Sequence, residues 1–189
     1  MATVPETVPP LTPPTDKPDA LYEFIDGEWK EIPRMGAIAA FLASILVTEL
    51  NNFARPNRLG IAMSEVLFRL APGGPARRPD VAFVAYDRWP YTSPPEDDPA
   101  ALDIVPNLAV EVNSPTNTFN EISGKVRDYF FDGVQLVWVV VPLHRMVYVY
   151  ESPEQARILS ENHELNGGTV LPGFRLPLAS LFASSAKPS

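Results

Sequence analysis

Cysteine is absent from this chain of 189 residues, and its absence excludes disulfides, thiolate metal sites and a cysteine nucleophile. It also permits an intracellular setting, and we expect a cytoplasmic protein. Histidine is scarce, because His144 and His163 are the only two, so a zinc site built from several histidines is not expected. Any metal should therefore lie among carboxylates, whose oxygens suit magnesium or manganese.

Long hydrophobic runs and an excess of positive charge are also missing. We expect no run to span a bilayer, and the first residues have neither the basic start nor the apolar core of a signal peptide, so no membrane partner is expected. The 15 basic and 23 acidic residues give a net charge of −8, which argues against a protein that coats nucleic acid electrostatically. A nuclease remains compatible with this charge, because a local basic rim can bind phosphates while a metal neutralises an acidic centre.

The length is typical of one domain with a single hydrophobic core, and we place this domain at residues 19–183. Six prolines lie within residues 1–18 and predict a disordered tail, although such a tail can also be a ligand for a partner domain. Residues 184–189 are expected to form a short second tail.

The first half of the domain shows clear local patterns. Asp26-Gly27 is a strong turn signal between two strand-like runs and predicts a hairpin over residues 21–32. Apolar residues at helical spacing predict one long, core-packed helix from Gly36 to Ala54, which Pro56 ends. This apolar face comprises Ile38, Phe41, Leu42, Ile45, Leu46, Leu50 and Phe53. Strands are expected at residues 59–63, 65–70 and 80–86.

The second half predicts a helix between two core strands. Residues 108–113 should be a strand buried on both faces, and residues 136–141 and 146–150 should form two more strands that pair through the turn at 142–145. The helix between them should run from Asn117 to Asp132 and end at Gly133. Its apolar face is expected to comprise Phe119, Ile122, Val126, Tyr129 and Phe130. The fold class is therefore α/β or α+β, with helices packed on a mixed sheet.

Two carboxylates and a lysine stand out against these strands. Asp80 precedes the apolar run Val81-Ala82-Phe83-Val84, Glu111 lies inside the run at 108–112, and Lys125 follows on the helix. Burying a carboxylate costs several kcal/mol unless something pairs with it, and two neighbouring carboxylates are most simply relieved by a divalent cation. With a nearby ammonium, this set suits attack on a phosphodiester. The alternative is two unrelated surface acids at strand ends.

These elements resemble the PD-(D/E)XK nuclease superfamily, and more closely its Uma-two family of restriction-endonuclease-like proteins. The resemblance extends from Tyr22 to Phe182. It is carried in order by residues 22–28, 78–82, 110–115, Lys125 with Tyr129, 133–134, 138–140 and 171–176. It implies a restriction-endonuclease-like mixed sheet flanked by helices with an N-terminal hairpin, a Mg²⁺ cofactor that Mn²⁺ can replace, a DNA substrate and a homodimer.

The resemblance also implies roles for individual residues. Asp80 resembles the motif aspartate and Glu111 the second metal carboxylate, with the backbone carbonyl of Val112 as a third metal ligand. Asn113 occupies the place of the superfamily's usual lysine, which makes Lys125 the candidate lysine.

Further positions match the family less directly. Glu65 resembles an additional metal ligand, with a strand-end acid as the equal alternative. Glu121 stands where the family often has aspartate, and Lys125 could instead form an exposed pair with it. Tyr129 is interpreted as core packing that could add a hydroxyl near the site, and Glu23 as structural.

Three functions are consistent with these residues. The first is a metal-dependent endonuclease that hydrolyses DNA phosphodiester bonds. The second is a catalytically silent nuclease fold that acts as a binding or regulatory module, and the third is a hydrolase of a smaller phosphodiester. The fold alone does not decide among them.

Overall fold

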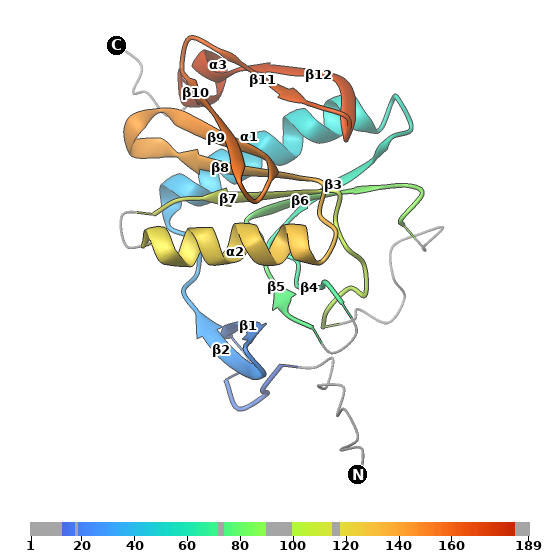
Figure 1. Cartoon of the computed structure of the whole chain (residues 1–189), viewed down its shortest axis with the longest axis vertical. Coiled ribbons are helices and arrows are strands. Elements are labelled where there is room, and N and C mark those ends of the chain that lie inside the picture. The colour runs from blue at the N-terminus through green and yellow to red at the C-terminus, as the bar shows by residue number, and fades with distance from the viewer. Residues whose placement is uncertain (1–12, 18, 72–73, 90–99, 115–117, 184–189) are drawn as a thin grey trace.

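The computed structural model describes residues 13–17, 19–71, 74–89, 100–114 and 118–183. Most of the tail expected at residues 1–18, and all of that expected at 184–189, lies outside the described residues. The described elements form a central sheet with one long helix on each face and an N-terminal hairpin below it (Figure 1).

The hairpin forms where the sequence predicts it. Strands β1 (Leu21–Ile25) and β2 (Glu28–Ile32) pair antiparallel. Asp26 and Gly27 have φ values of 53° and 81°, the conformation that a two-residue turn of this kind requires. The hairpin continues into a small sheet of order β2-β1-β5-β4, with β4 at Phe68–Arg69 and β5 at Ala76–Arg77.

The main sheet is mixed, as expected from the fold class. Its order is β10-β9-β8-β7-β6-β3, and β7 and β8 run parallel while the other neighbours pair antiparallel. The parallel pair follows from the crossover helix between its strands. The six strands are β3 (Gly60–Ser64), β6 (Val81–Ala85), β7 (Leu108–Val112), β8 (Leu136–Val141), β9 (Met146–Ser152) and β10 (Gln155–Ser160).

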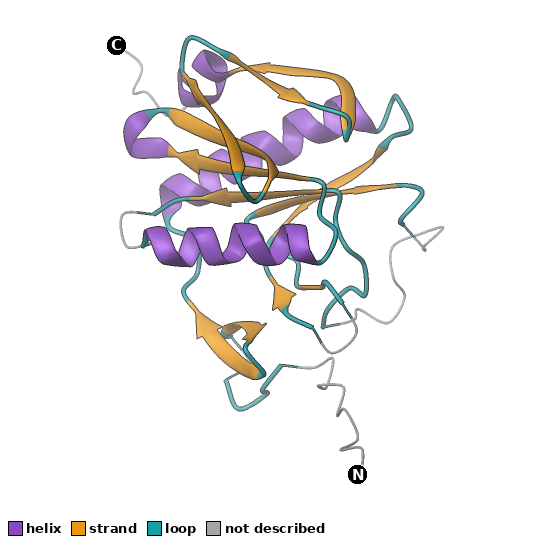
Figure 2. Ribbon diagram, viewed as in Figure 1, coloured by secondary structure: helices purple, strands orange, loops and turns teal. Residues whose placement is uncertain are grey.

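Helix α1 (Ala37–Ala54) covers one face of the sheet (Figure 2). Leu42, Leu46 and Leu50 are fully buried and share a hydrophobic cluster with β11 (Glu164–Gly167), β12 (Leu171–Pro177) and α3 (Leu178–Ala183). The predicted apolar face is wrong at Ile38 and Phe41, which are 63% and 43% exposed, because the alanines at 39 and 43 turn toward the sheet instead.

Helix α1 is also long and apolar enough to cross a membrane by length and composition, with a mean hydropathy of 1.5. This differs from the expectation that no run reaches that length. In the fold it packs through its leucines against the central sheet, as a core helix does.

Helix α2 (Phe119–Phe131) covers the opposite face. Val126 and Tyr129 are its buried residues, whereas the predicted core residue Phe119 is 82% exposed. Phe119 is the first helical residue and does not join the hydrophobic cluster that Val126 and Tyr129 form with the sheet. The helix begins with a capping box between Thr118 and Glu121 and ends before Gly133, whose φ is +97°.

The strand predicted at residues 65–70 is reduced to Phe68–Arg69. Glu65 has a φ of +54°, a left-handed conformation that ends β3 and redirects the chain. The turn at 142–145 is a 3-10 helix over Pro142–His144. Strands β10, β11 and β12 and helix α3 were not expected from the sequence, which shows only short or weakly periodic apolar runs after residue 152.

Candidate active site

The site lies where β6 begins and β7 ends. Asp80 precedes β6, and the antiparallel register that pairs Val81 with Val110 brings Asp80 beside the end of β7. There the backbone N–H of Val112 donates a hydrogen bond of 2.6 Å to Oδ2 of Asp80. The sheet register, rather than proximity in sequence, therefore joins the first predicted carboxylate to the strand that carries the second.

Glu111 is buried and accepts a hydrogen bond on each oxygen. The Nζ of Lys125 lies 2.9 Å from Oε2, and the hydroxyl of Tyr129 donates to Oε1 at 2.6 Å. Lys125 and Tyr129 are one helical turn apart, so α2 presents both on the same face. The structure thus brings Lys125 to Glu111, whereas the Glu121 carboxylate accepts from the backbone N–H and the hydroxyl of Thr118.

The pKa values of Asp80, Lys125 and Tyr129 all depend on burial and on the neighbouring carboxylates. Burial and the nearby charge of Glu111 raise the pKa of Asp80 to about 7, although the Val112 N–H and Lys125 oppose the rise. Burial alone would lower the pKa of Lys125, but the carboxylates of Glu111 and Glu23 raise it above its ordinary value. Burial and Glu111 also raise the pKa of the Tyr129 hydroxyl well above its ordinary value, so the hydroxyl remains a donor. The site therefore holds more negative charge than its one lysine offsets.

Glu23 belongs to this cluster, which the structural interpretation of its hairpin position missed. Its side chain is 1% exposed. Oε1 lies 3.5 Å from Nζ of Lys125 and accepts from the N–H of Arg78 at 2.9 Å, while Oε2 accepts from Arg77 at 3.0 Å. The sequence signal for a buried Glu23 was its position between two aromatic residues, Tyr22 and Phe24, both of which are buried in the structure.

Arg77 and Asp128 were also missed. Arg77 is buried and donates to the carboxylates of both Glu23 and Asp128. It thereby ties β5 to β1 and to α2. Asp128 follows Lys125 by three residues, and this spacing places both on the same side of α2. The spacing is the only sequence signal that Asp128 lies near the site.

The remaining predicted residues lie at the edge of the site. Glu65 donates from its backbone N–H to the carbonyl of Asp80 at 3.4 Å, and its charge adds to the raised pKa of Asp80. Asn113 donates from its N–H to the carbonyl of Val140 at 2.8 Å. Its side-chain Oδ1 is buried and has no hydrogen-bond partner within the described part of the chain.

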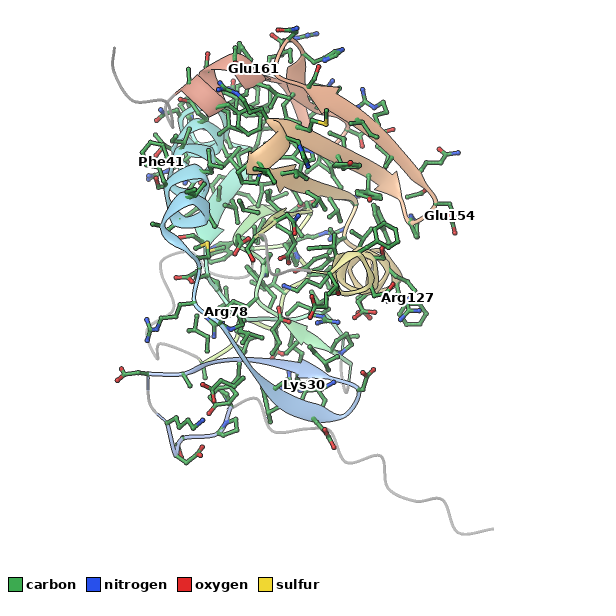
Figure 3. The ribbon with its side chains drawn as sticks, turned by 90° about the vertical axis from the view of Figure 1, so that its left-hand side faces the viewer. Lys30, Phe41, Arg78, Arg127, Glu154 and Glu161 are labelled. Carbon is green, nitrogen blue, oxygen red and sulfur yellow. The ribbon has the colours of Figure 1, made fainter. Side chains whose placement is uncertain are left out.

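A cavity of about 610 Å³ opens onto these groups. The hairpin forms one wall of the cavity and α2 another. Figure 3 shows the hairpin, labelled at Lys30, below α2, labelled at Arg127. Asp80, Glu111 and Lys125 all line it. The predicted trio is therefore accessible from outside despite its burial.

The donor set fits a small hard cation. Among the described residues, no group of three or more His, Cys, Asp and Glu side chains is placed to hold a metal. Mg²⁺ needs fewer, because it usually keeps several waters and binds through one or two carboxylates. Asp80 and Glu111 provide two, and the raised pKa of Asp80 marks a place where added positive charge is favourable.

Comparison with known proteins gives a family and a fold. The Uma2 family model, described as "Putative restriction endonuclease", matches residues 6–179. The fold is similar to the 1.96 Å crystal structure of a putative nuclease belonging to DUF820 from Anabaena variabilis ATCC 29413. That similarity has a TM-score of 0.74 and 19% sequence identity over 86% of this chain and 90% of that chain, so it concerns the fold alone. No curated protein matches the chain.

Proposed function

Because the chain belongs to the Uma2 family of putative restriction endonucleases, we propose that it is a magnesium-dependent nuclease that hydrolyses phosphodiester bonds of DNA. The observation that carries the proposal is the grouping of Asp80 and Glu111 with Lys125, whose Nζ lies 2.9 Å from Glu111, in the lining of an open cavity. A partly buried lysine held between carboxylates is an arrangement suited to charge stabilisation rather than to packing.

Each residue has a distinct part in this proposal. Asp80, Glu111 and the Val112 carbonyl would hold the cation, and Mn²⁺ could replace Mg²⁺. When bound, the cation supplies positive charge that stabilises the phosphoryl group and activates water. The ammonium of Lys125 orients the attacking water or offsets the charge that develops on the phosphoryl oxygens. Tyr129 holds Glu111 in place through its hydroxyl.

The test is cleavage of single-stranded and duplex DNA with Mg²⁺ or Mn²⁺ by wild type, Glu111→Gln and Glu154→Gln. Glu154 is exposed and does not line the cavity, and Figure 3 shows it well away from the hairpin labelled at Lys30, so its variant makes the same chemical change outside the site. We expect Glu111→Gln to lose cleavage while remaining folded, and Glu154→Gln to cleave like wild type.

Two outcomes would contradict the proposal. Equal residual activity in all three proteins would indicate a contaminant or a different active site. No cleavage with either metal, combined with retained DNA or protein binding, would favour a catalytically silent binding module.

A further inference from the structure

Two arginines line the cavity without forming a salt bridge to any described residue. Arg34 follows the hairpin, and its Nη2 donates to the backbone carbonyl of Asp19. Arg78 precedes Pro79 and Asp80, and its Nη1 donates to the backbone carbonyl of Glu65. Nε of Arg78 is buried and has no hydrogen-bond partner in the described residues. Glu23 and Glu65 attract Arg78 electrostatically, but the described part of the chain provides neither arginine with an ion pair.

Arg77 also lines the cavity, but its charge is paired within the protein. Its two terminal nitrogens each contact a carboxylate, from Glu23 and from Asp128, and the side chain is buried. Its charge is therefore neutralised inside the protein. Arg78 differs because its one side-chain anchor is a neutral carbonyl, which orients the guanidinium without neutralising it.

Several acids along the cavity are already engaged. Glu31 pairs with Lys17 at 2.5 Å, Glu121 caps α2, and Asp128 pairs with Arg77. The guanidinium groups of Arg34 and Arg78 therefore lie beside the acidic centre without an ion-pair partner in the described residues. A guanidinium without such a partner attracts an anion that also reaches the acidic centre.

A guanidinium is suited to such an anion, because its planar fork matches the oxygens of a phosphate bidentately. Anchoring by a carbonyl fixes the fork in advance and so reduces the entropy lost on binding. No aromatic side chain lines the described cavity, so it offers no platform for base stacking. The ligand chemistry is thus that of a sugar–phosphate backbone.

We propose that Arg34 and Arg78 form a phosphate clamp that binds the backbone of a DNA strand next to the bond to be cleaved. This inference rests on the proposed function and narrows its substrate. If the reacting phosphate lies at Asp80 and Glu111, an additional phosphate contact requires a neighbouring phosphate, so the clamp favours a polynucleotide over a small isolated phosphodiester. Because phosphate contacts carry no base information, binding should be independent of sequence.

The test measures the salt dependence of DNA binding. Fluorescence anisotropy is recorded with labelled single-stranded and duplex DNA of two unrelated sequences, with Mg²⁺ present and in a Glu111→Gln background that prevents cleavage. Arg34→Gln and Arg78→Gln are compared with Arg157→Gln, a matched control at an exposed arginine of β10 that pairs with Glu151 and does not line the cavity.

We expect each clamp variant to reduce the slope of log affinity against log salt by about 0.7 for single strands and about 0.9 for duplex. The affinity should fall alike for both sequences, and Arg157→Gln should leave the slope unchanged. Arg78→Lys, which keeps the charge and loses the fork, should keep the slope and bind more weakly. Thermal unfolding confirms that each variant is folded, and if Arg78→Gln is not, Arg34→Gln decides alone.

Unchanged slopes in the folded clamp variants would overturn the proposal, as would a background protein that binds no DNA. Failure of the clamp is separable from failure of the nuclease. If wild type cleaves DNA and the slopes do not change, the clamp alone is wrong. If the slopes fall and wild type cleaves nothing, the clamp stands and the nuclease is wrong.

Discussion

At the scale of single residues, Glu111 has a donor on each carboxylate oxygen, from Lys125 and from Tyr129. Asp80 has a donor on Oδ2, from the Val112 N–H. The two acids therefore differ in role: Glu111 is held in place by two side chains of α2, while Asp80 is the group whose protonation state changes near neutral pH, since its pKa is about 7. Their environments set this difference, because the side chains carry the same functional group.

This asymmetry predicts a pH dependence of stability. The pKa of Asp80 is about 7 in the folded protein and about 3.9 in an unfolded chain. The folded state therefore binds more protons between these values, so its extra stability is present below about pH 4 and is lost as the pH rises through about 7. Without metal, Asp80→Asn should be more stable than wild type at about pH 8, by roughly 2 kcal/mol, in thermal or urea unfolding.

In the proposed function Mg²⁺ binds the ionised form of Asp80, so added Mg²⁺ should remove this difference in stability. We expect added Mg²⁺ to raise the melting temperature of wild type more at about pH 8 than at about pH 5, and to have little effect on Asp80→Asn. Parallel pH profiles of the two proteins, unaffected by Mg²⁺, would show that Asp80 is an ordinary surface acid.

Lys125 gives a second prediction at this scale. Lys125→Ala should reduce the cleavage rate at least about 100-fold, the usual effect of removing one charge-stabilising donor. Its affinity for Mg²⁺, measured by isothermal titration, should hardly change, because an ammonium does not ligate a cation. The variant should also lose about 3 kcal/mol of stability, because it leaves the buried Glu111 and Glu23 without their shared partner.

Arg127 provides the control for Lys125 on the same helix. Arg127→Ala removes an exposed cation of α2 whose Nε lies 3.9 Å from Oδ1 of Asp128. The free energy of unfolding of this variant should change by only a few tenths of a kcal/mol. A similarly small stability loss in Lys125→Ala, with the cleavage rate unchanged, would mean that Lys125 is merely a helix-surface ion-pair partner.

At the scale of elements, the N-terminal hairpin is joined through ion pairs to α2, the helix of the candidate site. Glu23 of β1 lies 3.5 Å from Lys125 of α2 and accepts from Arg77 of β5. The hairpin thus supplies one wall of the cavity and one of the two carboxylates that hold the lysine. An element that lies at the periphery in Figure 1 is therefore part of the candidate site.

We predict that Glu23→Gln lowers kcat about tenfold and leaves KM nearly unchanged, because it loosens Lys125 without touching the cation ligands. Glu28→Gln, an exposed change on the neighbouring strand of the hairpin, is the matched control and should have neither effect. Steady-state kinetics on DNA separate the two constants. A folded Glu23→Gln protein with wild-type kcat would limit Glu23 to holding the hairpin in place.

At the scale of the whole molecule, the net charge of −8 limits where nucleic acid can bind. Most of the surface repels phosphate, so binding should be confined to the cavity and its rim. The described cations there that are exposed or lack a salt bridge are Lys30, Arg34, Arg78 and Arg127.

A modest salt dependence follows from this count. With about four phosphate contacts, the slope of log affinity against log salt for duplex DNA should be no steeper than about −4. Anisotropy titrations from about 50 to 200 mM salt measure it. A much steeper slope would place the DNA over a wider surface than the cavity. The homodimer and the cytoplasmic location expected from the sequence stay predictions.

Local signals in the sequence were sufficient for much of this protein. The hairpin at Asp26-Gly27, the helices α1 and α2 and the strands around Asp80 and Glu111 all follow from turn chemistry and periodicity, which act over a few residues. The family and the mixed sheet expected from the resemblance are confirmed. The roles of the site residues stay predictions, although Asp80, Glu111 and Lys125 do lie together.

Only the tertiary structure decided which charged side chains form ion pairs. Glu23 and Lys125 are about one hundred residues apart in the sequence, and no local pattern specifies that β1 packs beside α2. The same holds for the exposure of Phe41 and Phe119. Periodicity predicts which face of a helix is apolar, but it does not predict how much of that face the sheet covers. Propensity and periodicity are short-range properties, whereas burial and ion pairing depend on contacts between distant segments, which exist only once the chain has folded.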